Sequence, residues 1–172
     1  PVIEEGVIYK IIGVNYNEDP VAYNYEYFLL ENRQKVGFDE ELPGDGMLIF
    51  HIDGSLGSNR DQDHKKVDVE EADGNDNLDD EVNRGDSGDP YPGTSNNTVF
   101  NSLSYPNNFS YNTTSTFGIT NIKEEGENIS FDIEKDIMSG EQIKYDTDYM
   151  HWKKRFTELT DIYAGVLFQS NI

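Results

Sequence analysis

Short apolar runs separated by polar turns occupy the first 134 residues of the chain. Runs of this length, bounded by Gly, Pro, Asn and Asp, are typical of β-strands rather than helices. The pattern favours an antiparallel sandwich or barrel, and our prediction is a mainly β fold, an antiparallel β-sandwich with a long acidic loop and a short C-terminal extension. The predicted strands are residues 6–14, 26–34, 47–53, 67–72, 117–122 and 129–133, the last two forming a hairpin around EEGEN.

The strand at residues 26–34 is predicted to be a central one. Phe28 and Leu30 point to one face and Tyr27 and Leu29 to the other, so both faces are apolar. Apolar residues on both faces are typical of a strand that has neighbours above and below the sheet.

Glu31 and Arg33 lie two positions apart and therefore on the same face of that strand. We expect them to form a structural ion pair that holds the sheet edge, with a role in ligand binding as the alternative.

In the apolar strand MLIFHID, we expect His51 to be half-buried and hydrogen-bonded to a neighbour, the alternative being contact with a metal or ligand. His64 and His151 are expected at the surface.

Two regions lack such periodicity. Residues 73–105 are rich in Gly, Asn, Asp, Ser and Pro, and a loop of this length inside a compact domain is usually functional or poorly ordered. Residues 135–172 change in character, and we interpret them as a linker and the start of a further module. The sequence thus predicts a β-sandwich accessory domain at residues 1–134 followed by that extension.

The net charge of −21 makes nucleic acid and acidic membrane surfaces poor partners, because binding phosphates requires clustered Lys and Arg. Divalent cations and basic ligands fit the charge better. No segment is apolar and long enough to span a bilayer, so membrane insertion is not expected. The chain contains no Cys, begins with Pro and ends in an apolar run, and we interpret it as a piece of a larger protein.

Motifs for catalysis are absent from the sequence. There is no H-E-x-x-H zinc helix, no G-x-S-x-G nucleophile elbow and no Gly-rich phosphate loop. Cysteine-based nucleophiles and thiolate metal sites are excluded by composition. We therefore predict that this segment is not an enzyme.

The densest chemical signal is acidic. Between Asp53 and Asp89 the chain has thirteen Asp or Glu residues and four Lys or Arg residues. Either the loop is solvated and screened by counter-ions, or it binds a hard cation such as calcium, which takes six to eight oxygen ligands in irregular geometry. Both interpretations stay open.

An EF-hand is excluded by the spacing. Asp73, Asn75 and Asn77 match its first three ligand positions, but Leu78 replaces the required Gly and Arg84 replaces the final Glu. A calcium loop of another type remains a candidate, with GDSGDP as its tightest turn. The candidate calcium ligands are Asp53, Asp73, Asn75, Asp86 and Asp89.

Several motifs between residues 25 and 132 follow one another in a familiar order. They are EYFLLENRQ, GFDEELPGDGMLIFHID, VDVEEADG, GDSGDPYPG and FGITNI followed by ISFDI. This order resembles the β-rich region after the catalytic domain of immune inhibitor A-type secreted zinc metallopeptidases. The resemblance ends after Glu134.

The resemblance implies a bacterial parent protein that is secreted or displayed on the cell surface, with zinc bound only in a catalytic domain upstream of this segment. It also implies calcium sites in the non-catalytic parts and contact with the catalytic domain of the same chain. We therefore expect a calcium-stabilised β-sandwich that packs on and supports the protease domain. The alternative is an adhesion module in which Tyr and Asn of residues 91–112 bind a surface glycan or host protein, unless those aromatic residues cover the core instead.

Overall fold

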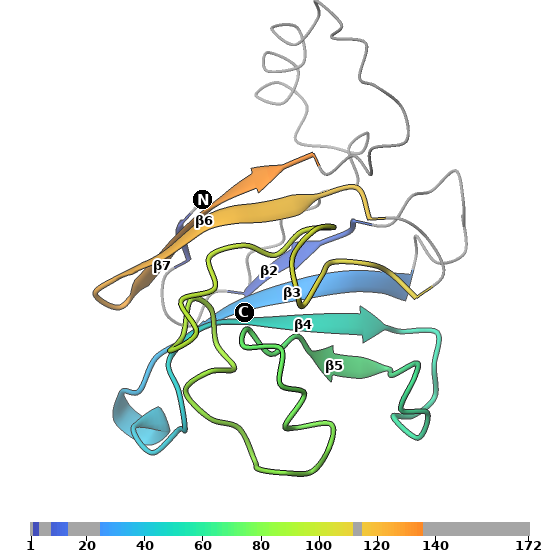
Figure 1. Cartoon of the computed structure of the whole chain (residues 1–172), viewed down its shortest axis with the longest axis horizontal. Helices are drawn as coiled ribbons and strands as arrows, with labels where there is room; N and C mark the ends of the chain where they lie inside the picture. The colour runs from blue at the N-terminus through green and yellow to red at the C-terminus, as the bar shows by residue number, and fades with distance from the viewer. Residues whose placement is uncertain (1, 4–7, 14–24, 112–114, 136–172) are drawn as a thin grey trace, which may run out of the picture.

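The computed structural model describes residues 2–3, 8–13, 25–111 and 115–135, so His151 and nearly all of the predicted extension lie outside the described residues. Two antiparallel β-sheets pack face to face, with β6 and β7 above β2 to β5 in Figure 1. The predicted mainly β sandwich is confirmed. Among the described residues, no helix has the length and apolar character needed to cross a membrane.

The larger sheet has the strand order β2-β3-β4-β5, formed by Ile8–Ile11, Glu26–Arg33, Gly46–Asp53 and Val67–Val69. Burial alternates strictly along β3, so one face is fully packed while the other is half-covered. On the packed face, Phe28 lies opposite His51 and Leu30 opposite Ile49.

The predicted Glu31–Arg33 pair is present, with Nε and Nη2 of the guanidinium donating to the carboxylate at 2.8 to 3.1 Å. It does not hold a sheet edge as expected, because β3 is an interior strand of its sheet. Both side chains are partly exposed, so the pair contributes at most about 1 kcal/mol.

The smaller sheet has the order β1-β7-β6, formed by Val2–Ile3, Asn128–Glu134 and Gly118–Glu125. The hairpin turn is tighter than predicted, because pairing continues to Glu125 opposite Asn128. Gly126 occupies the turn with a φ of 64°, a conformation that glycine adopts without strain. The 3-10 helix Gly37–Asp39 lies in the β3–β4 connection.

The core lies between the two sheets, and its members come from both sheets and from the connection between β5 and β6. Aromatic rings meet edge to face here, with Phe28 5.3 Å from Phe117 and 5.6 Å from Phe100. The fully buried large side chains are Ile11, Phe28, Leu30, Met47, Ile49, Tyr91, Phe100, Phe117, Ile119, Ile122 and Ile129.

The long connection between β5 and β6 is anchored at two points. Tyr91 exchanges two 2.8 Å backbone hydrogen bonds with Met47, and Phe100 exchanges two with Ile119, also at 2.8 Å. Both aromatic side chains are completely buried. Part of the aromatic content of residues 91–112 therefore covers the core, as one of the sequence interpretations holds.

We expect Tyr91→Ala to lower the free energy of unfolding by about 3–5 kcal/mol, because it removes a core ring that ties the loop to β4. The Tyr91 hydroxyl is buried without a hydrogen-bond partner in the described structure, so Tyr91→Phe should not destabilise the protein. Urea unfolding of the three proteins measures both effects. A Tyr91→Phe protein as unstable as Tyr91→Ala would show that the hydroxyl has a partner.

Candidate metal site

Three carboxylates come together where β5 ends and β4 begins. Because the two strands are antiparallel, the chain just after β5 runs beside the start of β4, and Glu70 N–H donates to the Ile49 carbonyl at 2.9 Å. Asp89 arrives from the other side, two residues before Tyr91 pairs with Met47. The result is a group of Glu71, Asp73 and Asp89 whose ligand oxygens lie within 4.8 Å of one another.

Backbone and side-chain donors fix each member of this group. Glu71 accepts hydrogen bonds from the backbone N–H groups of Asn77 and Leu78 at 2.8 and 2.9 Å. Asp73 accepts bonds from the backbone and the side-chain amide of Asn75. The oxygens are thus oriented before any ligand arrives, which lowers the entropic cost of binding.

Asp89 is the least satisfied member. Its side chain is almost completely buried, and Oδ2 accepts the Asp86 backbone N–H at 2.7 Å while Oδ1 has no partner in the described structure. Burial, and then the nearby charges of Asp86 and Asp73, raise the pKa of Asp89. Burial also raises the pKa of Glu71, and the charge of Asp89 adds to the effect. A bound cation would offset the burial and the mutual repulsion of these two carboxylates.

Gly88 makes space for the carboxylate oxygens of Asp73 and Asp86 because it has no side chain. A Cβ atom at Gly88 would collide with Oδ2 of Asp73 and would lie 3.0 Å from Oδ1 of Asp86. The absence of a side chain at this position therefore allows the GDSGDP turn to close on Asp73.

The structure brings together only some of the predicted ligands. Asp73 and Asp89 belong to the group, and Glu71 joins them although the sequence analysis assigned it to a strand. Asp86 lies alongside and braces the turn, accepting the Gly88 N–H at 2.7 Å and the Asn83 amide at 2.8 Å. Asn75 turns its amide nitrogen, a donor, toward Asp73 and so supports the group without offering an oxygen at that contact.

Asp53 lies elsewhere, and its grouping with the other candidates was wrong. It ends β4, about 20 Å along the strand from Met47 at 3.3 Å per residue. Its Oδ1 accepts hydrogen bonds from the Ser55 N–H at 2.9 Å and hydroxyl at 2.5 Å, and Oδ2 lies 2.8 Å from Nε2 of His64. Burial opposes ionisation of Asp53, but these contacts prevail and lower its pKa.

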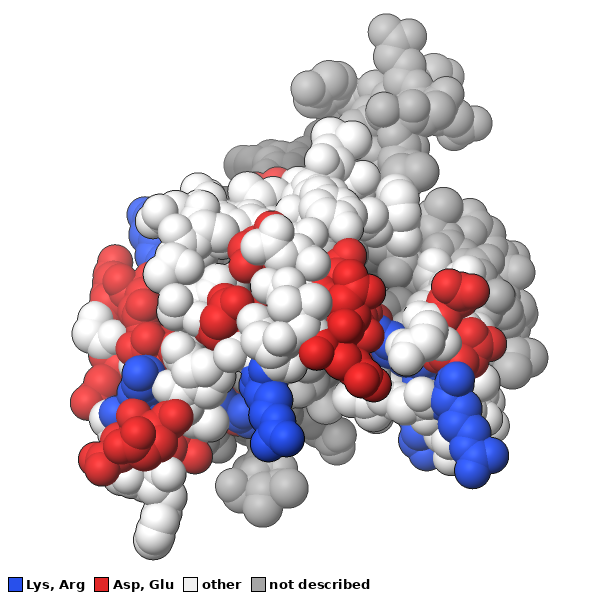
Figure 2. Space-filling view, turned by 60° about the horizontal axis from the view of Figure 1, so that its bottom comes forward, with Lys and Arg blue, Asp and Glu red and all other residues white. Residues whose placement is uncertain are grey.

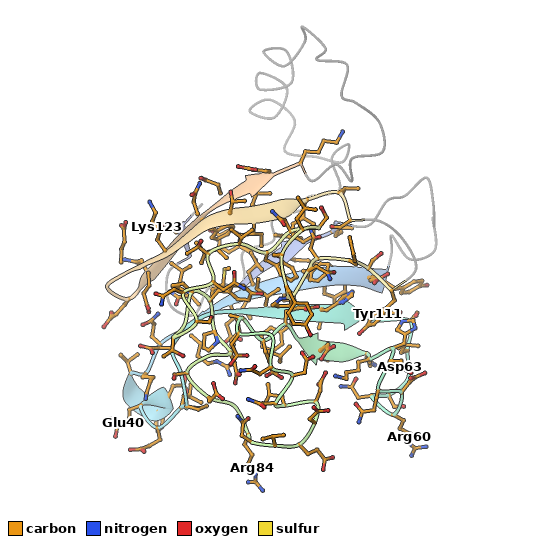
Figure 3. The ribbon with its side chains drawn as sticks, viewed as in Figure 1. Glu40, Arg60, Asp63, Arg84, Tyr111 and Lys123 are labelled. Atoms are coloured by element: carbon orange, nitrogen blue, oxygen red, sulfur yellow. The ribbon has the colours of Figure 1, made fainter. Side chains whose placement is uncertain are left out.

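Acidic side chains form several red groups on the face shown in Figure 2, with blue Lys and Arg side chains beside them in the lower half of the view. Arg84 extends from the tip of the long loop, whereas Arg60 and Asp63 lie on the separate loop between β4 and β5 (Figure 3). Glu71, Asp73 and Asp89 belong to the two ends of this loop, so their carboxylates meet at its base rather than at its tip.

A second concentration of charge surrounds His51. The side chain is fully buried rather than half-buried, with Nε2 2.8 Å from Glu26 Oε1 and Nδ1 3.5 Å from Glu70 Oε1. Its ring stacks between Phe28 at 4.4 Å and Tyr111 at 4.5 Å. Burial alone would lower the pKa of His51, but the hydrogen bonds and charges of the two glutamates outweigh it and raise the pKa to about 9.

This charge arrangement does not supply a catalytic base. A protonated His51 uses both ring nitrogens as donors, so it has no lone pair for proton abstraction at neutral pH. The contact between Ser55, Asp53 and His64 is also unlike a nucleophile and its base, since the Ser55 hydroxyl donates to the carboxylate and not to the imidazole. His64 is partly exposed, it contacts Asp53, and its ring lies 4.0 Å from the Tyr111 ring at a tilt of 33°.

No family model, curated protein or solved structure matches the chain. The relation to immune inhibitor A-type peptidases stays a prediction from the order of the motifs.

We expect Gly88→Ala to lower the free energy of unfolding by about 1–3 kcal/mol, because the new methyl group displaces the Asp73 carboxylate. Gly57→Ala is the matched control, since a Cβ atom there has no neighbour within 4 Å. Chemical denaturation compares the two. Equal stability of the two variants would show that the Gly88 turn does not need its close approach to Asp73.

We expect the His51 ring to titrate near pH 9, followed by its Cε1–H chemical shift in NMR spectra. Because the folded pKa lies above the ordinary histidine value of 6.5, this pairing stabilises the fold fully below pH 6.5 and is lost as the pH rises through 9. The difference between 6.5 and about 9 corresponds to a loss of ~3 kcal/mol in the free energy of unfolding. A ring that titrates below pH 6.5 would contradict the buried ion pairs.

Proposed function

We propose that this chain is a non-catalytic β-sandwich module whose long loop is held in place by a calcium ion bound to Glu71, Asp73 and Asp89. The observation that carries the proposal is the buried Asp89 Oδ1, which lacks a partner in the described structure while two further carboxylates lie within reach. A buried carboxylate oxygen without a donor is costly unless a cation compensates it.

The ligand set favours calcium over other metals. Every member is a carboxylate, and zinc and copper sites usually include His or Cys. Calcium tolerates irregular geometry and completes its six to eight ligands with carbonyl oxygens and water. Magnesium demands a regular octahedron, which residues from two separate turns supply less readily.

The consequence of binding would be mechanical. The ion would join the chain after β5 to the GDSGDP turn before Tyr91, where Ala72 N–H already donates to the Asp89 carbonyl at 2.9 Å. Anything that binds only the folded state stabilises it, by about 2.7 kcal/mol at a hundred times the dissociation constant. A secreted protein meets enough calcium to fill even weak sites of this kind.

The order of the motifs supports a second proposal, about the parent protein. We propose that this module follows the catalytic domain of a secreted immune inhibitor A-like zinc metallopeptidase, packs on that domain and stiffens it. Large apolar side chains exposed on its loops support a role in contact with another protein surface. They include Phe38, Val82, Leu103, Tyr105 and Phe109.

The adhesion alternative draws on part of the same surface. Tyr105 is two-thirds exposed, unlike the buried Tyr91, and so remains available to stack on a ligand. A glycan array tests sugar binding directly. Silence across the array would leave protein contact as the role of this surface.

We expect calcium to raise the thermal midpoint relative to chelator, by on the order of 10 °C at saturation. Asp89→Asn should abolish most of this rise because it removes a ligand charge. Asp63→Asn, in the separate β4–β5 loop, should leave the rise unchanged. Differential scanning calorimetry measures all three proteins, and equal midpoints of the wild type in calcium and chelator would contradict the proposal.

The effect of calcium should also depend on pH. The raised pKa values of Glu71 and Asp89 mean that their protons compete with the ion, so the calcium-induced rise should shrink as the pH falls through those values. In chelator, the stability of the fold itself should change in the opposite direction and fall as the pH rises. The reason is that these two carboxylates ionise less readily in the folded state, so their ionisation disfavours the fold. Melts in matched buffers with calcium and chelator separate the two trends.

A further inference from the structure

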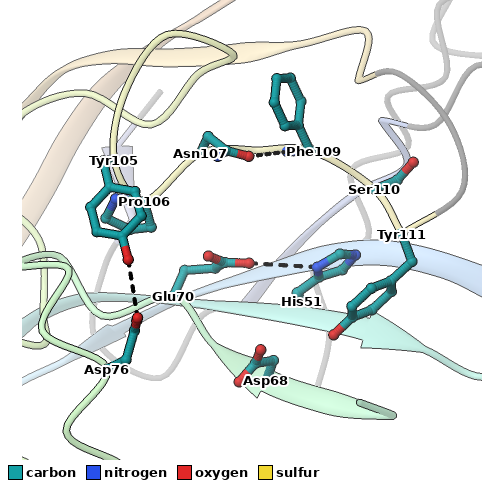
Figure 4. A pocket seen from close by; sticks show the side chains of 10 residues that line it. All are labelled: His51, Asp68, Glu70, Asp76, Tyr105, Pro106, Asn107, Phe109, Ser110 and Tyr111. Atoms are coloured by element: carbon teal, nitrogen blue, oxygen red, sulfur yellow. Dashed lines mark hydrogen bonds and ion pairs between the residues drawn. The ribbon is translucent and has the colours of Figure 1, made fainter. Parts of the chain in front are cut away.

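A pocket of about 280 Å³ opens over β4, above the buried His51. Tyr105 and Tyr111 lie on opposite sides of it, with Glu70 and His51 between them (Figure 4). This volume is at the small end for ligand sites, which range from about 300 to 1,000 Å³. The pocket therefore suits a single side chain or a small group better than a large ligand.

The pocket carries more negative than positive charge. His51 is balanced by Glu26 behind it, and Asp68 is paired with Lys65 at 3.0 Å. Glu70 and Asp76 give the pocket its excess of negative charge. Glu70 lies 3.5 Å from His51, whose single charge also serves Glu26, and Asp76 accepts only the Tyr105 hydroxyl, at 3.0 Å. A cation entering the pocket would meet Glu70, which has only a share of the His51 charge, and Asp76, which forms no ion pair with the described residues.

The aromatic walls are held in place although one of them is exposed. The Tyr105 ring lies directly against the backbone of Gly74, where a Cβ atom would collide with it. Tyr111 is held at its backbone N–H by Glu26 at 2.7 Å and at its hydroxyl by Lys65 N–H at 3.1 Å. Side chains fixed in this way lose little entropy when a ligand binds between them.

We propose that this pocket receives an arginine side chain from a segment of a partner protein. A guanidinium is planar, stacks on a tyrosine ring and donates through a fork that matches carboxylates, so it uses the exposed Tyr105 ring and the acids together. Arginine side chains are also among the commonest anchors of protein interfaces.

A protein segment fits better than a free cation. Leu103 and Phe109 are exposed on the loop that carries Tyr105, at 90% and 39% of their surface. Residues flanking the arginine would cover these apolar groups, whereas a small amine would leave them in water. The proposal goes beyond the support role, and it holds whether or not the partner is a catalytic domain.

The test titrates the calcium-saturated protein with the peptide acetyl-Gly-Arg-Gly-amide and follows chemical shifts by NMR. The control peptide replaces arginine with citrulline, which has the same shape without the charge. We expect saturable shifts at Tyr105, Tyr111 and His51 with a dissociation constant near millimolar, as one anchor side chain supplies. The citrulline peptide should bind at least several-fold more weakly.

Two variants have matched controls. Asp76→Asn removes a surplus charge while keeping a residue that tolerates its φ of 53°, and Asp80→Asn neutralises a neighbouring exposed carboxylate outside the pocket. Tyr105→Ala removes a wall, and Leu103→Ala removes another exposed side chain of the same loop. We expect Asp76→Asn and Tyr105→Ala each to weaken peptide binding about two- to five-fold.

Equal binding of the arginine and citrulline peptides would overturn the proposal, as would shifts spread over the acidic surface without saturation. Equal weakening by Asp76→Asn and Asp80→Asn would show general charge attraction and would overturn it too. If the arginine peptide does not bind but calcium still raises the melting midpoint, only the pocket proposal is refuted. The peptide titration tests the pocket residues, whereas the melts test the carboxylates of the metal site.

Discussion

Two backbone attachments of the long β5–β6 connection determine where the charged groups of this protein lie. The backbone hydrogen bonds between Met47 and Tyr91 hold Asp89 near the end of β5, where it lies beside Glu71 and Asp73. The exchange between Phe100 and Ile119 ties the same connection to the smaller sheet, and the chain then returns over β4 to place Tyr111 on His51. Without these attachments the acidic residues would repel one another into solvent.

The fold meets the problem of buried negative charge in two different ways. Around His51 the chain supplies its own cation, since the contacts with Glu26 and Glu70 raise the pKa of the imidazole to about 9. Among the described residues, no Lys, Arg or His forms an ion pair with Glu71, Asp73 or Asp89. The first solution works in any medium within its pH range. The second, if an ion binds as proposed, depends on a cation that the surroundings provide.

Local pattern was sufficient for most of the sheet framework. Short apolar runs bounded by turn residues located β3, β4, β6 and β7 to within a few residues, because each of these strands packs on the core. The two-residue β1 was missed, since its pairing depends on a remote partner strand and not on its own sequence. The connection after β5 has no period, so nothing in its pattern showed that Tyr91 and Phe100 are core residues.

The candidate site was predictable in part for the same reason. Asp73 and Asp89 stand beside glycines in turns, where carboxylates often gather, and the structure brings these two together. Glu71 was overlooked because it follows a strand directly. Asp53 was included wrongly because closeness in sequence does not reveal that a strand carries its two ends about 20 Å apart. The depth of His51 was underestimated because Tyr111, which covers it, is sixty residues away in the chain.

The metal group and the pocket share one short stretch of chain, and this links their behaviour. Glu70 continues the extended backbone of β5, so Glu70 and Glu71 point to opposite sides, one toward the pocket and the other toward the metal group. Asp76 of the pocket directly precedes Asn77, whose N–H binds Glu71. An ion that fixes Glu71 therefore also fixes the backbone that presents Asp76. The proposed calcium site and the proposed recognition pocket thus share one turn, so an ion that orders the first would also order the second.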